Sequence, residues 1–189
     1  MFDPSLVHPE HIRPLTRTEY DRIVDTGIFD GQELELLRGM LVTMSPQGEV
    51  HAGLTAWLVR WFVRKLDDGY DVRGHSPYAA TDDSEPEPDV TVSRATHLFA
   101  HPTSPLLVIE VSDSSIRKDR TLKSSIYAEA GAPEYWIIDV TGDELVVQVH
   151  TQPSPLGYGR TVTLRDGDVL RPTRLDLELP VLDLPFPRD

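Results

Sequence analysis

The stretch LLVIEVSDSSIRKDRTLKSSIYAEAGAPEYWIID, residues 106–139, decides the fold of this chain. Its opening run is rich in Leu, Val and Ile, which is typical of a buried strand. A segment with helical spacing follows and is ended by Gly131 and Pro133. The apolar run EYWIID then predicts a second strand. Strand, helix and strand in this order, after an earlier helix, predict a mixed α/β or α+β core.

The composition limits the classes of protein to which this chain can belong. A chain of 189 residues is long enough for one domain with a sizeable core. We expect the Pro-rich residues 1–15 to form an arm and residues 16–189 to form a single domain. The absence of cysteine excludes disulfides, thiolate zinc sites and a cysteine nucleophile. No run is as long as a membrane span and no signal-peptide core is present, so we expect a cytoplasmic protein with no membrane partner.

The net charge of −13 bears on the choice of partner. Nucleic-acid binding depends on Lys and Arg, so this charge disfavours non-specific attraction to phosphates. It leaves room for a local basic cleft, or for carboxylates that await a divalent cation.

The remaining segments follow the same rules. Thr16 with Glu19 forms a capping-box pattern and predicts a short helix. Residues 33–44 alternate around Gly39 and predict either a strand pair or a bent strand. Helical spacing over 50–66 predicts a long helix whose aromatic stripe packs in the core. Further strands are expected at 70–78, 89–93, 144–150 and 160–170, and the acidic residues 81–88 are expected to form a solvated loop.

Glu110 is out of place in its apolar strand. A buried carboxylate costs several kcal/mol unless it is paired, hydrogen-bonded or bound to a metal. Pro88 and Asp89 begin the preceding strand, and if the two strands are neighbours, Asp89 and Glu110 lie close together. Two adjacent carboxylates repel each other unless a cation lies between them. Sites rich in oxygen suit Mg²⁺ or Mn²⁺.

Lys123 is a second anomaly. At about 100° per residue, the apolar residues of the following helix cover an arc that also contains Lys123. A single lysine there commonly extends its amine to solvent. An ion pair or a shared ligand with Glu110 would explain both residues at once.

Three segments together resemble a known family. They are ELLRGMLVTMSPQGEVH (35–51), EPDV (87–90) and the stretch 106–139. In order and spacing they are similar to the Uma-type restriction endonucleases, a branch of the PD-(D/E)xK nuclease superfamily, over residues 16–187. The resemblance implies a restriction-endonuclease-like fold, in which helices flank a central mixed sheet and the active site lies at one edge.

The resemblance also implies roles for single residues. Asp89 and Glu110 match the two acids that hold a divalent metal, and with Lys123 they would form the catalytic set. The lysine that usually follows the second acid by two places is replaced here by Ser112. In this family that lysine is thought to have moved to the next helix, where Lys123 is the matching position.

Two further positions match the family. Glu35 matches an acid that would join the metal shell or orient its water, and His51 matches a frequent histidine at the head of the long helix. His51 is equally compatible with a satisfied helix-start histidine. Met40 departs from the family pattern, where an acid is usual.

The implied activity is endonucleolytic hydrolysis of DNA phosphodiester bonds with Mg²⁺ or Mn²⁺, without a small-molecule cofactor, in a possible homodimer. The alternative is a catalytically inactive nuclease-fold module that binds partners or nucleic acid, because fold does not establish activity. A glycosidase pair formed by Asp89 and Glu110 is a third reading, which the lack of a neighbouring aromatic in the sequence disfavours.

Asp119 either caps the helix, which we favour, or lies behind Lys123. The nearby basic residues are expected to be solvated: Arg117, Lys118 and Arg120.

Overall fold

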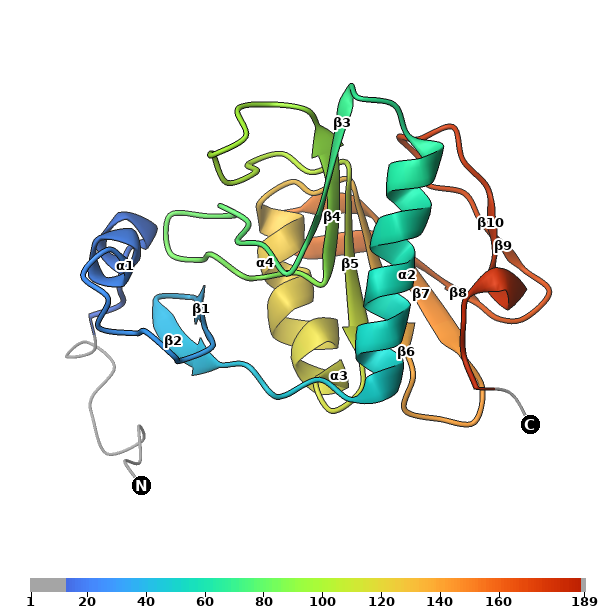
Figure 1. Ribbon diagram of the computed structural model, residues 1–189, viewed down its shortest axis with the longest axis horizontal. Helices are drawn as coiled ribbons and strands as arrows, with labels where there is room; N and C mark the ends of the chain where they lie inside the picture. The colour runs from blue at the N-terminus through green and yellow to red at the C-terminus, as the bar shows by residue number, and fades with distance from the viewer. Residues whose placement is uncertain (1–12, 188–189) are drawn as a thin grey trace.

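A mixed six-stranded sheet lies between two helical layers in the computed structural model, which describes residues 13–187 (Figure 1). Its strand order is β3-β4-β5-β6-β7-β8, and neighbours are antiparallel except for the parallel pair β5 and β6. The mixed sheet flanked by helices confirms the fold expected from the sequence. The strands are β3 (Tyr70–Gly74), β4 (Val90–Arg94), β5 (Leu107–Ser112), β6 (Glu134–Asp139), β7 (Val146–Ser154) and β8 (Gly157–Leu164).

One helical segment connects the parallel strands β5 and β6. It consists of α3 (Ile116–Lys118), a π-helical turn (Asp119–Lys123) and α4 (Ser124–Glu129). Parallel neighbours require such a crossover connection, because a tight turn can only join antiparallel strands. Gly131, at φ 76°, follows the helix and reverses the chain towards β6.

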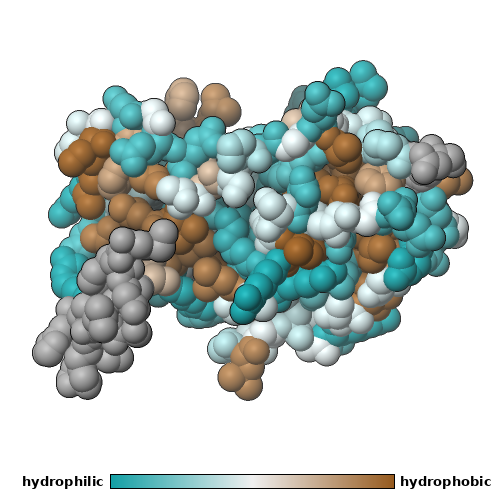
Figure 2. Space-filling model, turned by 90° about the horizontal axis from the view of Figure 1, so that it is seen from below, coloured by the Kyte–Doolittle hydropathy of each residue, from teal (hydrophilic) through white to brown (hydrophobic). Residues whose placement is uncertain are grey.

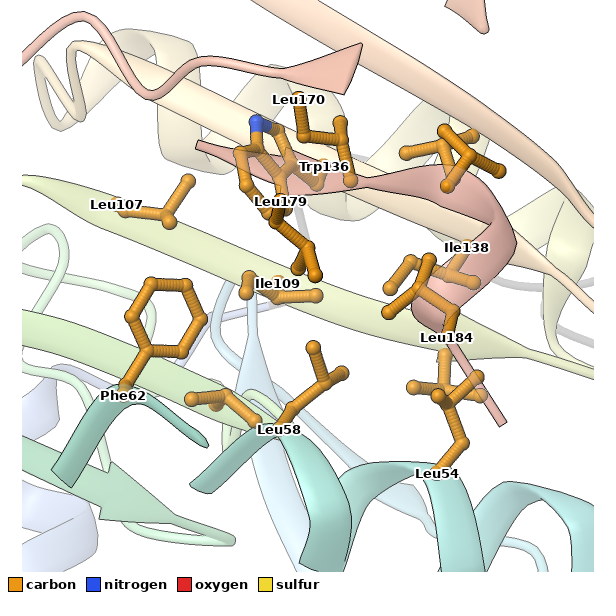
Figure 3. Close-up of a cluster of buried hydrophobic side chains, with 14 of the residues drawn as sticks. Leu54, Leu58, Phe62, Leu107, Ile109, Trp136, Ile138, Leu170, Leu179 and Leu184 are labelled. Carbon is orange, nitrogen blue, oxygen red and sulfur yellow. The ribbon is translucent and has the colours of Figure 1, made fainter. Parts of the chain in front are cut away.

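Alternation along the strands divides the core between the two faces of the sheet. Ile109 of β5 and Trp136 of β6 face the helix α2 (Glu49–Lys65), which contributes Leu58 and Phe62 (Figure 3). Val108 belongs to a second cluster, beneath α4 on the opposite face. Because strand side chains alternate, Glu110 points to the same face as Val108. The expected long helix and its core-facing stripe are therefore confirmed.

The C-terminal segments cover the α2 side of the sheet. The short strands β9 (Val169–Leu170) and β10 (Leu179–Pro180) pair with each other, and a 3₁₀ turn follows (Val181–Asp183). Leu170, Leu179 and Leu184 join the same apolar cluster as α2 (Figure 3). This layer completes the larger of the two cores.

The N-terminal part adds the helix α1 (Arg17–Val24) and a hairpin of β1 (Leu34–Leu37) and β2 (Met40–Thr43). The capping box is confirmed: the Glu19 N–H donates to Thr16 Oγ1 at 3.3 Å and the Thr16 N–H donates to Glu19 Oε2 at 3.0 Å. The turn residues Arg38 and Gly39 both have positive φ, 52° and 73°, as a two-residue type I′ turn requires. Of the two alternatives for 33–44, the strand pair is therefore correct.

The surface of this N-terminal part exposes apolar side chains. Ile28 is 65% exposed and Met40 is 55% exposed, and hydrophobic residues gather on the same side of the molecule in the view from below (Figure 2). The arm expected at 1–15 lies almost entirely outside the described residues. Between residues 13 and 187, no helix combines the length and apolarity needed to cross a lipid bilayer.

The acidic loop 81–88 differs from its prediction. Glu85 is only 3% exposed, and its backbone N–H donates to the Leu36 carbonyl of β1 at 2.8 Å. The loop is therefore not a solvated one, because it packs against the N-terminal hairpin and buries part of its charge.

Candidate active site

The register of the sheet brings Asp89 and Glu110 together. Val90 of β4 is paired with Ile109 of β5, so continuing this antiparallel register by one residue places Asp89 opposite Glu110. Both carboxylates are buried, with 5% and 4% exposure. The Val111 N–H donates to Asp89 Oδ2 at 2.7 Å, which fixes the aspartate across the strand boundary.

Lys123 lies against Glu110 on the α4 face of the sheet. Its Nζ is 3.0 Å from Glu110 Oε1 and 3.0 Å from Glu35 Oε2. The side chain is 4% exposed and does not extend to solvent. Glu35, from β1, is fully buried. The two unusual residues of the sequence, Glu110 and Lys123, therefore form an ion pair, and the N-terminal hairpin adds the carboxylate of Glu35.

The π-helical turn accounts for a second lysine in the cluster. Lys118 and Lys123 are five residues apart, which would place them about 140° apart around a regular α-helix. In the π turn the Ser124 N–H donates to the Asp119 carbonyl, a five-residue spacing. Lys118 therefore shares a face with Lys123, and its Nζ lies 2.7 Å from Glu35 Oε1. The prediction that Lys118 is solvated is wrong, because its amine is paired with the buried carboxylate of Glu35.

Glu35 is held by these two ammonium groups. Burial alone would raise the pKa of its carboxyl, but Lys123 and Lys118 outweigh burial and lower it. Glu35 is therefore an ionised anchor that ties the β1–β2 hairpin to the helix after β5.

Tyr127 is a contact that the sequence analysis missed. Its hydroxyl donates to Glu110 Oε1 at 2.6 Å. Burial, followed by the charge of Glu110, raises the pKa of Tyr127 well above its usual value, so the hydroxyl remains a donor. The signal was available, because Tyr127 follows Lys123 by four residues on one helix face. An aromatic residue does lie beside an acid, contrary to what the local sequence indicated.

The charges of the cluster are not balanced. Burial raises the pKa of Glu110, the attraction of Lys123 lowers it, and Asp119 and Asp89 raise it again, leaving it well above the usual value. Burial lowers the pKa of Lys123, but Glu110, Glu35 and Asp119 raise it further, so the ammonium stays protonated. An added cation near Glu110 and Asp89 would relieve the excess of negative charge.

Asp119 does not cap the helix, which corrects the favoured prediction. It lies inside the π turn, is 1% exposed, and accepts hydrogen bonds from Ser112 Oγ at 2.7 Å and Ser115 Oγ at 2.5 Å. Ser112 stands where the resemblance implies a lysine, and here it orients an aspartate that acts electrostatically on Lys123. The alternative position, behind Lys123, is the one that the burial of Asp119 and its charge effect on Lys123 favour.

Two histidines face Asp89. His51, on the first turn of α2, places Nε2 2.8 Å from Asp89 Oδ1, and His75 Nδ1 lies 3.4 Å from the same oxygen. His51 therefore contacts the acid that the family resemblance indicated. Nothing in the sequence pattern pointed to His75, which enters the site through the loop after β3.

The remaining predicted neighbours separate into two groups. Arg120 is exposed, as expected, and its guanidinium also pairs with Asp139 at 2.8 Å. Arg117 is exposed as expected, and its guanidinium has no ion-pair or hydrogen-bond partner among the described residues. Met40 is 55% exposed and does not line the cleft, so the departure from the family pattern lies outside it.

A cleft of about 80 Å³ joins these groups, with Glu35, His51, Asp89, Glu110 and Lys123 all in its wall. Within residues 13–187, no group of three or more His, Asp or Glu side chains is arranged to hold a metal ion. Mg²⁺ commonly uses only one or two carboxylates plus water and substrate oxygens, so the pair Asp89 and Glu110 still fits it. Glu110 Oε2 accepts no hydrogen bond from any described residue and remains available.

Comparisons with known proteins agree with the fold and the motifs. Residues 17–182 match the model of the Uma2 family, described as "Putative restriction endonuclease". A crystal structure from Anabaena variabilis ATCC 29413, described as "a putative nuclease belonging to DUF820", aligns with a TM-score of 0.70. It is 17% identical, and the alignment covers 90% of this chain and 97% of that one, which shows a shared fold. No curated protein matches the chain. Since the family model spans most of the sequence, the chain belongs to the Uma2 family.

Proposed function

We propose that the protein is a divalent-metal-dependent endonuclease that hydrolyses phosphodiester bonds of DNA. Family membership and the nuclease-like fold support a nuclease function. The observation that carries the finer proposal is the convergence of Asp89, Glu110 and Lys123 in one cleft. Asp89 and Glu110 would hold Mg²⁺ or Mn²⁺. When bound, the ion polarises a phosphoryl oxygen and lowers the pKa of a coordinated water.

Lys123 has the role of stabilising charge. The raised pKa of Lys123 keeps its amine protonated, so it does not serve as a general base. An ammonium at the cleft wall stabilises the additional negative charge that develops on phosphorus as the bond to water forms. Glu110 and Glu35 orient this ammonium from two sides, each at 3.0 Å.

Other side chains position the two acids. The Tyr127 hydroxyl and Lys123 both bind Glu110 Oε1, which leaves Oε2 to face a cation. His51 and the Val111 N–H bind opposite oxygens of Asp89. Such hydrogen bonds limit rotation of the carboxylates, and a fixed geometry of this kind lowers the cost of reaching the transition state.

A plasmid-nicking assay with Mg²⁺ or Mn²⁺ tests the proposal. We expect the native protein to nick supercoiled DNA, and Glu110→Gln to reduce the rate by at least about 100-fold, because a neutral amide cannot balance the ion. Glu134→Gln is the matched control. Glu134 is a buried carboxylate of the neighbouring strand β6, but it binds Trp136 Nε1 at 2.6 Å and lies outside the cleft.

Lys123→Gln is the second variant in the assay, because it replaces the ammonium group of Lys123 by an amide that is polar but uncharged. Urea denaturation of each variant separates lost chemistry from lost folding. Equal nicking by the native protein and Glu110→Gln would attribute the activity to a contaminant. No nicking under any condition, with the native protein folded, would favour the alternative of a catalytically inactive binding module.

Three further parts of the proposal need their own measurements. We expect DNA to be cleaved in preference to RNA, and a cleavage assay that compares DNA with an RNA of matched sequence tests this. We expect a homodimer, because two active sites would allow both strands of a duplex to be cut. Sedimentation analysis, which reports the mass of the particle in solution, tests this. The expected cytoplasmic location is tested by fractionating cells that express the protein.

A further inference from the structure

A side groove opens beside the cleft. It lies between the end of β2 and the start of the helix 116–129, and its volume is about 480 Å³. The two hollows are adjacent, because they share four lining residues: Ser45, Ser114, Ser115 and Lys118. A chain-like ligand that leaves the cleft on this side would next meet the side groove.

Carboxylates outnumber the two lysines in the wall of the cleft, Lys118 and Lys123, whereas the charged side chains of the side groove are basic. Six acidic residues line the cleft: Glu35, Glu87, Asp89, Glu110, Asp113 and Asp119. No carboxylate of a described residue lines the side groove, whose polar groups are Arg117, Lys118 and five hydroxyls. This difference stands out in a chain with a net charge of −13. The side groove is suited to an anion without help from a metal.

Several donors in the side groove are uncommitted. Among residues 13–187, no side chain or carbonyl binds the guanidinium of Arg117, and the same holds for the hydroxyls of Thr43, Ser45 and Ser114. Lys118 is committed to Glu35 at 2.7 Å. An arginine presents a planar pair of N–H donors that matches two phosphate oxygens. Arg117 is therefore the principal candidate to bind the anion, with Ser45 and Ser114 as auxiliary donors.

We infer that the side groove is a subsite for a phosphodiester group of the same nucleic-acid strand, adjacent to the group that is cleaved. The inference rests on the proposed function, because the phosphodiester that is cleaved in the cleft determines which neighbouring phosphodiester reaches the side groove. Val42 and Leu122 form the apolar part of the wall, against which a sugar or base can pack. The groove thus offers donors for a phosphate and an apolar wall for the nucleoside beside it.

Binding without cleavage tests the inference. Fluorescence anisotropy with a short single-stranded DNA in EDTA compares the native protein with Arg117→Glu. We expect a loss of affinity of about tenfold. For Arg117→Ala, the slope of log affinity against log salt should fall by about 0.7, the value for one phosphate contact on a single strand. The matched control is Arg160→Glu, since Arg160 is an exposed arginine of β8, outside both hollows.

The outcomes separate this inference from the proposed function. Weakening by Arg117→Glu but not by Arg160→Glu supports the subsite, even if the native protein never nicks a plasmid. Equal weakening by both variants, or by neither, overturns the subsite even where nicking is intact. Failure of the native protein to bind the oligonucleotide also overturns it. Circular dichroism of each variant confirms that its fold is retained.

Discussion

Glu110 shows at the scale of one residue how a buried charge is accommodated. One of its oxygens accepts from both Lys123 and Tyr127, at 3.0 and 2.6 Å. Such charge-assisted hydrogen bonds offset part of the desolvation cost. Burial, and after it the repulsion of Asp119 and Asp89, still raises the pKa of Glu110. The residue is therefore stabilised in place but remains suited to a cation.

Removal of the Tyr127 hydroxyl measures how much its hydrogen bond to Glu110 contributes to stability. Tyr127→Phe removes a hydrogen bond to a buried carboxylate, so we expect the free energy of unfolding to fall by about 1–2 kcal/mol in urea denaturation. Divalent-cation affinity should fall as well, because Glu110 is less firmly oriented.

Tyr78→Phe is the control for that experiment. Tyr78 is also fully buried and stacks on Tyr127 with ring centroids 5.9 Å apart, but its hydroxyl has no hydrogen-bond partner within the described chain. Its removal should leave stability unchanged or increase it. Equal losses for the two variants would contradict the role given to Tyr127.

At the scale of elements, the π turn determines which side chains meet. It aligns Lys118 with Lys123 across five residues, and both reach Glu35. π turns occur frequently at functional sites, since they re-aim side chains within a helix. This element therefore connects the crossover helix to the N-terminal hairpin.

Changes of helix length test the π turn. Deleting Thr121, which is exposed, leaves the two lysines four residues apart and about 40° apart in a regular α-helix, so the ion pairs with Glu35 can persist. Inserting one alanine after Thr121 separates them by about 120°. We expect the insertion to lower the free energy of unfolding by about 3 kcal/mol or more, because buried charges lose their partners, and the deletion to cost less. The reverse order in urea denaturation would refute the role of the turn.

The acidic loop makes a second element-scale prediction. Burial, with Asp21 adding to it, raises the pKa of Glu85 from 4.5 to about 7. The folded state therefore binds more protons than the unfolded state between these values, so this group's contribution to stability is present below about pH 4.5 and is lost as the pH rises through about 7. Glu85→Gln should stabilise the protein by about 1–3 kcal/mol at pH 8 and by much less at pH 5.

Thermal unfolding of Glu85→Gln at the two pH values is the measurement. Asp82→Asn serves as its control, because Asp82 lies in the same loop but is exposed. A pH-independent effect of Glu85→Gln would mean that Glu85 does not titrate in this range.

At the scale of the whole molecule, the two proposed metal ligands couple cation binding to folding. A cation that binds only the folded state stabilises it by about 2.7 kcal/mol at 100 times its dissociation constant. We expect Mn²⁺ to raise the melting temperature of the native protein and of Glu134→Gln. It should not do so for Asp89→Asn. A shift of the same size in all three proteins would indicate binding elsewhere.

Much of the architecture follows from local patterns in the sequence. The alternation in β5 and β6, the helical stripe of α2 and the capping box at Thr16 each reflect short-range rules, and all were confirmed. The inward position of Lys123 followed from the same periodicity. What failed depended on long-range contacts or on departures from regular geometry: the burial of Glu85 beneath β1, the pairing of Lys118 through the π turn, and the approach of His75 to Asp89.

The parallel pairing of β5 with β6 has a consequence for folding kinetics. The antiparallel strands β6, β7 and β8 are joined through short connections and can pair locally, whereas the pairing of β5 with β6 must wait until residues 113–133 have crossed back over the sheet. Lys123 and Tyr127, the partners of Glu110, lie on this crossing segment. Packing of this segment against β5 therefore removes the acid from water and supplies its partners in the same step, so we expect folding to slow when either partner is removed.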